Sequence, residues 1–137
     1  MRTLTEDQVE IGAILPELTI DLTPTLIVST ALATLDPTPV HHDAEAARAQ
    51  GSQDIFLNIL TTMGLVERFV TDWAGPEVVI RGINVKLGLP AYAGDRLTFQ
   101  GRVVKAENGE FTVEVCGRVS LGDHAIGTVR LTLPEAA

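Results

Sequence analysis

The order of apolar and polar residues predicts one long helix followed by several β-strands. Over residues 54–73, apolar side chains recur at helical spacing on nearly every side until Glu67, and Gly75-Pro76 then ends the helix. At about 1.5 Å per residue such a helix is a rod of roughly 30 Å. Because the rod is apolar nearly all round, we expect other elements to surround it.

Downstream of this helix the pattern changes to alternation, which is typical of strands with one buried face. The predicted strands are residues 78–89, 96–106, 111–121 and 124–133. Asn108-Gly109, between the second and third of them, is a strong hairpin signal. Parallel strands need long crossovers that these short connections do not provide, so the sheet is predicted to be antiparallel. The chain fits the α+β class, as a single domain over residues 1–137 in which an antiparallel sheet wraps round the long central helix, as in the hot-dog fold.

Shorter elements precede the long helix. Alternation around Leu18 and Ile20 predicts a short strand. The apolar run of residues 26–34 is β-rich at its start, and a run of this length does not distinguish a strand from a helix. Asp43 is a natural N-cap for a short helix over residues 44–50.

Composition and charge narrow the functional classes. The 137 residues, 45% of them hydrophobic and 20% charged, fit a globular domain that is short for enclosing a large substrate alone, which suggests a partner chain. The net charge of −8 argues against nucleic-acid binding, which needs a concentrated basic face. It also means that any site for an anionic ligand is a local basic patch or belongs partly to another subunit.

Several features bear on where the protein works. The single Cys116 cannot form an internal disulfide and reads as a small sheet residue, not as a nucleophile. The first ten residues are polar and acidic, the reverse of a signal peptide. No run reaches the roughly 18 to 20 apolar residues that span a bilayer. We therefore expect a cytoplasmic protein without a membrane segment.

The candidate chemistry lies in the loop Asp36-Pro-Thr-Pro-Val-His41-His42-Asp43. Its two prolines restrict the backbone and hold Asp36 and His41 on a semi-rigid segment. A carboxylate and an imidazole five residues apart can hold one water between them and exchange protons with it. The loop alone also allows a structural interpretation, in which Asp36 ends a strand, His41 lies on the surface and Asp43 caps the next helix.

This loop resembles the signature of MaoC-like enoyl-CoA hydratases, Asp-x-Asn-Pro-(Leu/Ile/Val)-His-x-Asp. Thr38 stands where the family has Asn, and a hydroxyl supplies one hydrogen bond but not an amide's full set. Further segments are similar to one subfamily, the small MaoC-like subunits of heteromeric enoyl-CoA hydratases that act on the shortened side chain of cholesterol in steroid-degrading actinobacteria. They include residues 28–34, 51–56, 58–61, 70–76 and 121–124, and the match covers residues 12–133.

The resemblance implies an α2β2 heterotetramer. In it this chain supplies the catalytic Asp36 and His41, and a larger MaoC-like partner makes room for a steroid-sized acyl group. The implied reaction adds water across the 2,3-double bond of an acyl-CoA thioester, with no cofactor or metal besides the substrate. Asp36 is the expected base for attack of the water on Cβ, and His41 is expected to donate or relay a proton to Cα.

Three further residues are candidates for substrate binding. Asn58 stands near the position where family members bind the thioester oxygen, which becomes negative during the reaction, with an internal hydrogen bond in a buried helix as its alternative role. Gly51 ends the preceding helix, and Ser52 offers a cap for the next one, so both are expected to position the helix entry or to contact the acyl-CoA. His42 is interpreted as a loop or partner contact, and His124 as a turn or interface residue.

Two other functions stay open at this point. A hot-dog acyl-CoA thioesterase needs a carboxylate or polar nucleophile on the central helix, where Asp54 is the only early acid and looks like a partner for the helix dipole. The second alternative is a non-catalytic scaffold that stabilises the active site of a partner subunit.

Overall fold

The computed structural model describes all 137 residues and contains one five-stranded sheet and three α-helices. The strands are β1 (Leu18–Asp21), β2 (Val79–Leu87), β3 (Arg96–Glu107), β4 (Glu110–Val119) and β5 (Gly122–Thr132), and the α-helices are α1 (Pro24–Ala33), α2 (Ala44–Ala49) and α3 (Ile59–Ala74). Two single-turn 3-10 helices, η1 (Glu6–Gln8) and η2 (Pro39–His41), complete the set. None of the helices has the length and apolar character needed to cross a lipid bilayer.

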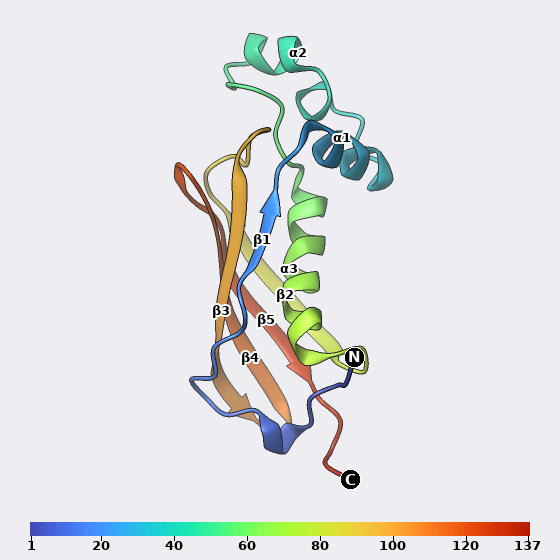
Figure 1. Cartoon of the computed structure of the whole chain (residues 1–137), viewed down its shortest axis with the longest axis vertical. Helices are drawn as coiled ribbons and strands as arrows, with labels where there is room; N and C mark the ends of the chain where they lie inside the picture. Colours follow the sequence, from blue (N-terminus) through green and yellow to red (C-terminus); the bar gives the residue numbers. More distant parts are fainter.

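Neighbouring strands of the sheet are all antiparallel, in the order β1-β3-β4-β5-β2 (Figure 1). The predicted hairpin joins β3 to β4 through Asn108 and Gly109, whose φ angles of 53° and 74° are those that a two-residue type I′ turn requires. The four strands predicted in the second half of the chain are confirmed, with ends that differ by at most two residues.

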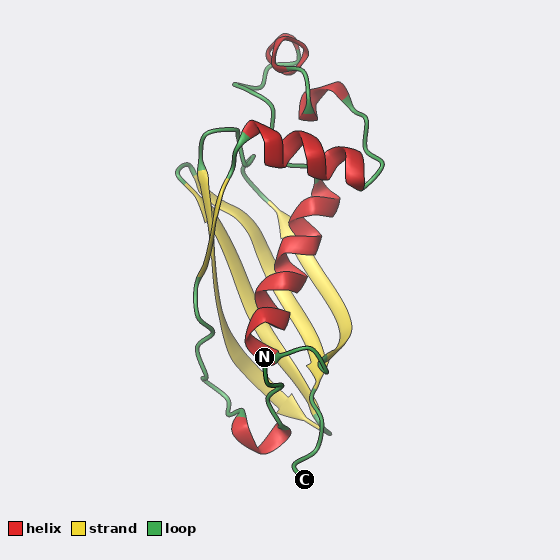
Figure 2. Cartoon of the chain, turned by 45° about the vertical axis from the view of Figure 1, so that its right-hand side comes forward, coloured by secondary structure: helices red, strands yellow, loops and turns green.

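Helix α3 lies along one face of the sheet, which curves partway around it (Figure 2). The buried side chains between them include Val66, Phe69 and Val70 of α3 and Leu97, Phe99, Val103, Val113, Val115, Val129 and Leu131 of the strands. These strand residues alternate with more exposed ones along β3, β4 and β5, as expected of strands with one buried face. Each such side chain contributes roughly 1.5 to 3 kcal/mol when fully buried. An antiparallel sheet curved around one long helix is the hot-dog fold that the sequence predicted.

The expectation that other elements surround α3 is wrong for this chain. Ile59 and Leu60 are 54% and 53% exposed, because the sheet covers only one side of the helix and no second layer of this chain covers the other.

The start of α3 also differs from the prediction. The helix begins at Ile59 and not at Asp54, because the preceding backbone is paired with the loop between β2 and β3. The Leu57 N–H donates to the Ala91 carbonyl at 3.0 Å, and the Ala93 N–H donates to the Ile55 carbonyl, also at 3.0 Å. These extended residues use their backbone groups between segments, so they cannot make helical hydrogen bonds.

Residues 24–33 form a helix, α1, although the run looked β-rich at its start. Thr23 decides the outcome: its side chain accepts a hydrogen bond from the Leu26 N–H at 3.1 Å, and Pro24 occupies the first helical position, where no N–H is needed. Asp43 caps α2 as predicted, accepting from the Ala46 N–H at 3.1 Å. The predicted strand around Leu18 is confirmed as β1.

Both short helices lie at one end of the molecule, beyond the N-terminus of α3 (Figure 1). The chain leaves β1 there, forms α1, η2 and α2, and returns to begin α3. The candidate loop of residues 36–43 therefore lies at the same end of the molecule as the start of α3.

Gly75 at the end of α3 gives a test of the packing at the opposite end. Its φ is +99°, and a methyl group there would overlap Thr3 Cα and lie 2.9 Å from the Arg2 carbonyl oxygen. We expect Gly75→Ala to destabilise the fold by about 2 to 4 kcal/mol, from backbone strain plus the overlap. Urea unfolding followed by Trp73 fluorescence measures this free energy.

Gly94→Ala is the matched control for that variant. Gly94 has a similar φ of +87°, but nothing lies within 4 Å of the added methyl group, so only the strain of about 1 to 2 kcal/mol applies. Equal losses in the two variants would contradict the close contact between Gly75 and the N-terminal segment.

Candidate active site

Asp36 is positioned by the end of α1. Its backbone N–H donates to the Ala31 carbonyl at 2.9 Å, and the Leu35 N–H donates to the Leu32 carbonyl at 3.1 Å. With Leu35 at φ +58°, these two bonds form a Schellman ending, which satisfies the last carbonyls of the helix. The Asp36 side chain, 23% exposed, therefore starts from a fixed backbone rather than from a mobile loop.

His41 lies on η2 and is buried. Its Nδ1 atom is 2.7 Å from the Phe56 carbonyl oxygen, and because a carbonyl only accepts, Nδ1 carries the proton of that bond. The Phe56 ring also packs edge-on against the imidazole, with 5.0 Å between the ring centroids. These contacts aim the other nitrogen, Nε2, at Asp36 Oδ2, 3.4 Å away. The structure thus brings together the two side chains that the sequence paired.

Thr38 binds the opposite side of the Asp36 carboxylate. Its hydroxyl donates to Oδ1 at 2.6 Å, and its backbone N–H donates to the same oxygen at 3.3 Å. The hydroxyl bond lowers the pKa of Asp36 most, with further lowering from the Thr38 N–H, Asn58 and His41 against an opposing effect of burial. Asp36 is therefore ionised at neutral pH, as a general base must be.

Asn58 lies directly before α3 and is buried, with 1% of its surface exposed. Its amide nitrogen donates to Thr34 Oγ1 at 2.8 Å and to Asp36 Oδ2 at 3.2 Å. Its side-chain oxygen accepts a hydrogen bond from the Thr61 hydroxyl. The internal hydrogen bond considered as its alternative role is present, and contact with a substrate stays a prediction.

Gly51 and Ser52 donate backbone hydrogen bonds to the last carbonyls of α2. Gly51 has φ +93° and donates to the Arg48 carbonyl, while Ser52 donates its N–H to the Ala47 carbonyl, each at 3.0 Å. The expected role of Ser52 as a cap of the next helix is wrong, because bends and an isolated β-bridge follow it and the next helix begins only at Ile59. No hydrogen bond joins Gly51 or Ser52 to Asp36 or His41, and their contact with an acyl-CoA stays a prediction.

The other two histidines have separate surroundings. His42 is exposed, and its Nε2 lies 3.0 Å from the Pro37 carbonyl oxygen, outside the Asp36–His41 pair. His124 is not a turn residue: it lies in β5, 3% exposed, between the Leu89 carbonyl on Nδ1 (2.7 Å) and the Thr62 hydroxyl on Nε2 (2.9 Å). Burial lowers the pKa of His124, partly offset by the bond to Leu89, so the ring is neutral at neutral pH.

Sequence reasoning missed two threonines of the site. Thr34 and Thr61 both bind the Asn58 amide, from α1's C-cap and from the first turn of α3. Each stands in an apolar run of the sequence. A polar residue that is buried with such a run needs a hydrogen-bond partner, and this was the signal that could have identified both threonines. Their pairing through Asn58 depends on how α1 crosses α3, which periodicity does not show.

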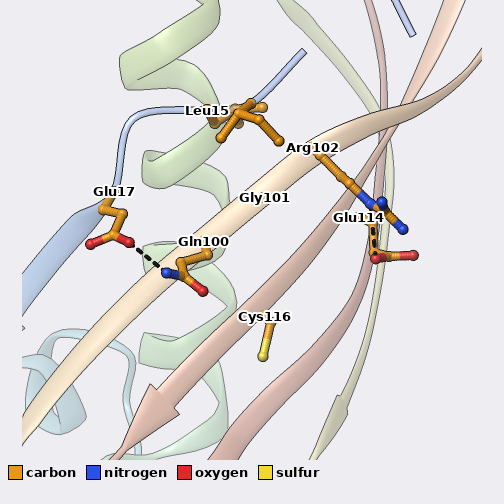
Figure 3. A pocket seen from close by; sticks show the side chains of 8 residues that line it. Leu15, Glu17, Gln100, Gly101, Arg102, Glu114 and Cys116 are labelled. Atoms are coloured by element: carbon orange, nitrogen blue, oxygen red, sulfur yellow. Dashed lines mark hydrogen bonds and ion pairs between the residues drawn. The ribbon is translucent and has the colours of Figure 1, made fainter. Parts of the chain in front are cut away.

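A separate hollow of about 370 Å³ lies on the outer face of the sheet (Figure 3). Its polar side chains bind one another: Gln100 donates to Glu17, and Arg102 pairs with Glu114 at 3.5 Å. Burial and the neighbouring Asp123 raise the pKa of the Cys116 thiol, so the thiol is protonated and unreactive at neutral pH. The hollow contains none of the predicted site residues.

The site so built contains an ionised carboxylate and an imidazole whose free nitrogen faces it. Such a pair can remove a proton from one atom and deliver a proton to another. No three His, Cys, Asp or Glu side chains converge in a way that would hold a metal ion.

Comparison with known proteins identifies the class first. The R-hydratase PhaJ1 of Pseudomonas aeruginosa superposes with a TM-score of 0.90 over 98% of this chain and 88% of that one, at 18% identity, which confirms the hot-dog fold. The model of the MaoC like domain matches residues 8–124. The chain belongs to this family.

Two similarities are much closer. The 3-oxo-4,17-pregnadiene-20-carboxyl-CoA hydratase beta subunit of Mycobacterium tuberculosis is 55% identical over 92% of this chain and 98% of its own length. The crystal structure of the ChsH1-ChsH2 complex from the same organism contains a chain with a TM-score of 0.89 and 56% identity, over 90% of this chain and 98% of that one. These matches confirm the resemblance on which the sequence interpretation rested.

His124 predicts how stability depends on pH. Its folded-state pKa lies below the unfolded value of about 6.5, so below that pH the unfolded chain binds a proton that the folded chain does not. Stability should fall as pH drops through 6.5, by up to about 1.4 kcal/mol per pH unit. Urea unfolding between pH 7.5 and 5 should show a smaller slope for His124→Gln than for the wild type.

The exposed His42 provides the control. His42→Gln removes an exposed ring instead of a buried one, so its free energy of unfolding should follow the wild-type curve over this pH range. If His124→Gln and the wild type lost stability in parallel over this range, burial of a neutral His124 would be excluded as the cause.

Proposed function

We propose that this chain is the catalytic MaoC-like subunit of a heteromeric enoyl-CoA hydratase, which adds water across the 2,3-double bond of a steroid side-chain acyl-CoA. The observation that carries the proposal is the approach of Asp36 Oδ2 to His41 Nε2, 3.4 Å apart, in a chain 55% identical to a steroid carboxyl-CoA hydratase subunit. The hydratase signature loop is thereby folded into an acid–base pair.

The geometry suggests how the pair holds water. With the proton of the Phe56 bond on Nδ1, the neutral form of His41 presents a lone pair at Nε2, and the ionised Asp36 presents another. Two acceptors that face each other are bridged by a molecule that donates to both. A water at the apex of this triangle directs its oxygen lone pairs outward, towards Cβ of the substrate.

Hydration then needs two proton movements. Asp36 accepts a proton from the water as the water oxygen bonds to Cβ, and the electrons of the double bond move towards the thioester to form an enolate. That proton then passes from Asp36 to Nε2 of His41, across the short gap between them, and His41 delivers it to Cα, so both groups return to their starting state. The reactants are the enoyl thioester and water, and the proposal includes no cofactor.

The thioester oxygen gains negative charge during the attack and needs a donor. The Leu57 N–H is occupied by Ala91, and both hydrogens of the Asn58 amide are occupied by Thr34 and Asp36. The backbone N–H groups of the first turn of α3 have no partner within the helix, and the positive end of its dipole lies beside the pair. We therefore expect these backbone N–H groups to donate hydrogen bonds to the thioester oxygen.

The proposal includes a second MaoC-like subunit in an α2β2 heterotetramer. Two Mycobacterium tuberculosis comparisons support this: the 55% identical relative is named as a beta subunit, and the solved chain that this chain resembles comes from the ChsH1-ChsH2 complex. Ile59 and Leu60, exposed beside the site, are consistent with a second chain that completes it. A cytoplasmic location belongs to the same proposal, and the unpaired Cys116 supports it.

The structure weakens the thioesterase alternative. Asp54 is not on α3, and its carboxylate accepts from the Ile55 N–H at 2.7 Å and lies 3.9 Å from Arg48. The first acid of α3 is Glu67, which is exposed and more than one turn beyond Asn58. The carboxylate that is hydrogen-bonded to the start of α3 is that of Asp36, through Asn58.

Substitution in the reconstituted complex tests the proposal. Asp36→Asn and His41→Ala should each lower kcat for hydration of a steroidal enoyl-CoA by about 10²-fold to 10⁴-fold, because each removes a proton-transfer group. The assay follows loss of the enoyl-thioester absorbance and identifies the hydroxyacyl product by mass spectrometry.

Two controls separate the alternatives. His42→Ala and the remote Asp72→Asn should keep most of the activity, since neither side chain touches the pair. Full activity in Asp36→Asn and His41→Ala would show that the chain is a scaffold. Release of free coenzyme A thiol without a hydrated product would show a thioesterase.

A further inference from the structure

We propose that Asn58 is a positioning residue for the reaction, which acts by leaving the Asp36 carboxylate a single free lone pair beside His41. The inference rests on the proposed function, because it takes Asp36 to be the base. It replaces the expected contact between the Asn58 side chain and the substrate.

The first argument is the number of acceptor sites on Asp36. An ionised carboxylate offers about four lone-pair sites, two on each oxygen. The hydroxyl and N–H of Thr38 take both sites of Oδ1, and Asn58 takes one site of Oδ2. The site that remains is on Oδ2, the oxygen that lies 3.4 Å from His41 Nε2. Proton acceptance is thereby confined to the side on which the imidazole stands.

The second argument is that the Asn58 amide has only one consistent orientation. The Thr34 hydroxyl donates to the Thr30 carbonyl at 2.8 Å, so towards Asn58 its oxygen acts as an acceptor. The ionised Asp36 also only accepts. The two hydrogens of the amide must therefore point to Thr34 and Asp36, and its oxygen must face Thr61. Asn58 and Thr61 are 1% and 6% exposed, so water does not compete for these bonds.

The third argument is what Asn58 does not do. It occupies the N-cap position of α3, where an Asn side chain ordinarily accepts a hydrogen bond from the second or third N–H of the helix. Here no such capping bond is made, and the amide turns to Asp36 instead. A residue selected only to begin the helix would make the capping bond.

These bonds join three separate segments at the carboxylate. Thr34 comes from the end of α1, Asp36 from the loop after it, and Asn58 with Thr61 from the start of α3. Without the amide, the Asp36 carboxylate can turn about its last side-chain bond and loses one stabilising donor. Both the direction and the ionisation of the base then change.

Asn58→Ala in the reconstituted complex tests the inference. A hydrogen bond to a charged group contributes about 1.5 to 3 kcal/mol, so kcat should fall about 10-fold to 100-fold, with KM changed less than about 3-fold. The acidic limb of the kcat/KM profile should move to higher pH, because the anionic form of Asp36 has lost a donor. Gln100→Ala, which removes an amide on the outer face of the sheet, should leave kcat and profile unchanged.

Thr34→Val provides a second, smaller variant. Valine keeps the shape of the side chain but removes the oxygen that accepts from the Asn58 amide. The fall in kcat and the shift of the acidic limb to higher pH should therefore both appear, each smaller than in Asn58→Ala. If Asn58→Ala does not fold, Thr34→Val alone tests the inference. An acidic limb of its kcat/KM profile that stays at the wild-type pH would overturn the inference.

The decisive measurement combines Asn58→Ala with Asp36→Asn. If Asn58 acts through Asp36, its removal should cost less than about 3-fold in the Asp36→Asn background. An undiminished 10-fold to 100-fold loss there would show that Asn58 touches the substrate directly and would overturn the inference. A different result would contradict the proposed function itself: the single variant Asp36→Asn would then keep its activity.

Discussion

The packing of α3 against the curved sheet determines where every functional side chain lies. Phe69 of α3 stacks on Phe99 of β3, with 5.8 Å between the ring centroids, at the centre of this contact. Two strand glycines make the approach possible: a methyl group on Gly101 would lie 2.9 Å from Phe69, and one on Gly117 would lie 2.8 Å from Phe99. Close packing of this kind leaves α3 little freedom to slide, so the N-terminus of the helix is held at one end of the sheet.

The site uses that fixed helix end but little of the helix itself. Asp36 is placed by the ending of α1, and His41 is placed by a carbonyl of the extended segment before α3. The same segment is paired with the loop between β2 and β3 through Leu57 and Ala91. Backbone hydrogen bonds, rather than long flexible side chains, therefore set the distance between the Asp36 carboxylate and the His41 imidazole. The proposed proton-transfer role benefits from this, because the efficiency of such a pair depends on geometry before it depends on pKa.

The sequence predicted most of the fold because its signals were local. Alternation identified all four strands after α3, and Asn108-Gly109 identified their first hairpin, since both depend on neighbouring residues alone. The start of α3 was placed too early because the segment from Asp54 is apolar enough for a helix. Its extended form comes from pairing with residues that lie more than thirty positions further along the chain.

The same distinction applies to the site. Asp36 and His41 were predicted because a short motif contains both, and the resemblance to a family gave the motif a role. The threonines around Asn58 were not predicted, since they meet only after α1 has crossed the beginning of α3. His124 was misjudged for a related reason: it follows a turn in sequence, yet a carbonyl and a hydroxyl from distant segments bury it.

Charge gives a physical reason for this site to be completed by a second chain. Seven of the ten Lys and Arg side chains form ion pairs with carboxylates of the same chain, which leaves Arg2, Arg81 and Lys86 outside such pairs. An acyl-CoA carries several phosphate charges, and the net charge of −8 repels them. In the proposed assembly, the Asp36–His41 pair and the exposed Ile59 and Leu60 come from this chain, and basic side chains of a partner would offset its negative charge towards a coenzyme A thioester. This charge imbalance is a physical argument for dividing the site between two subunits.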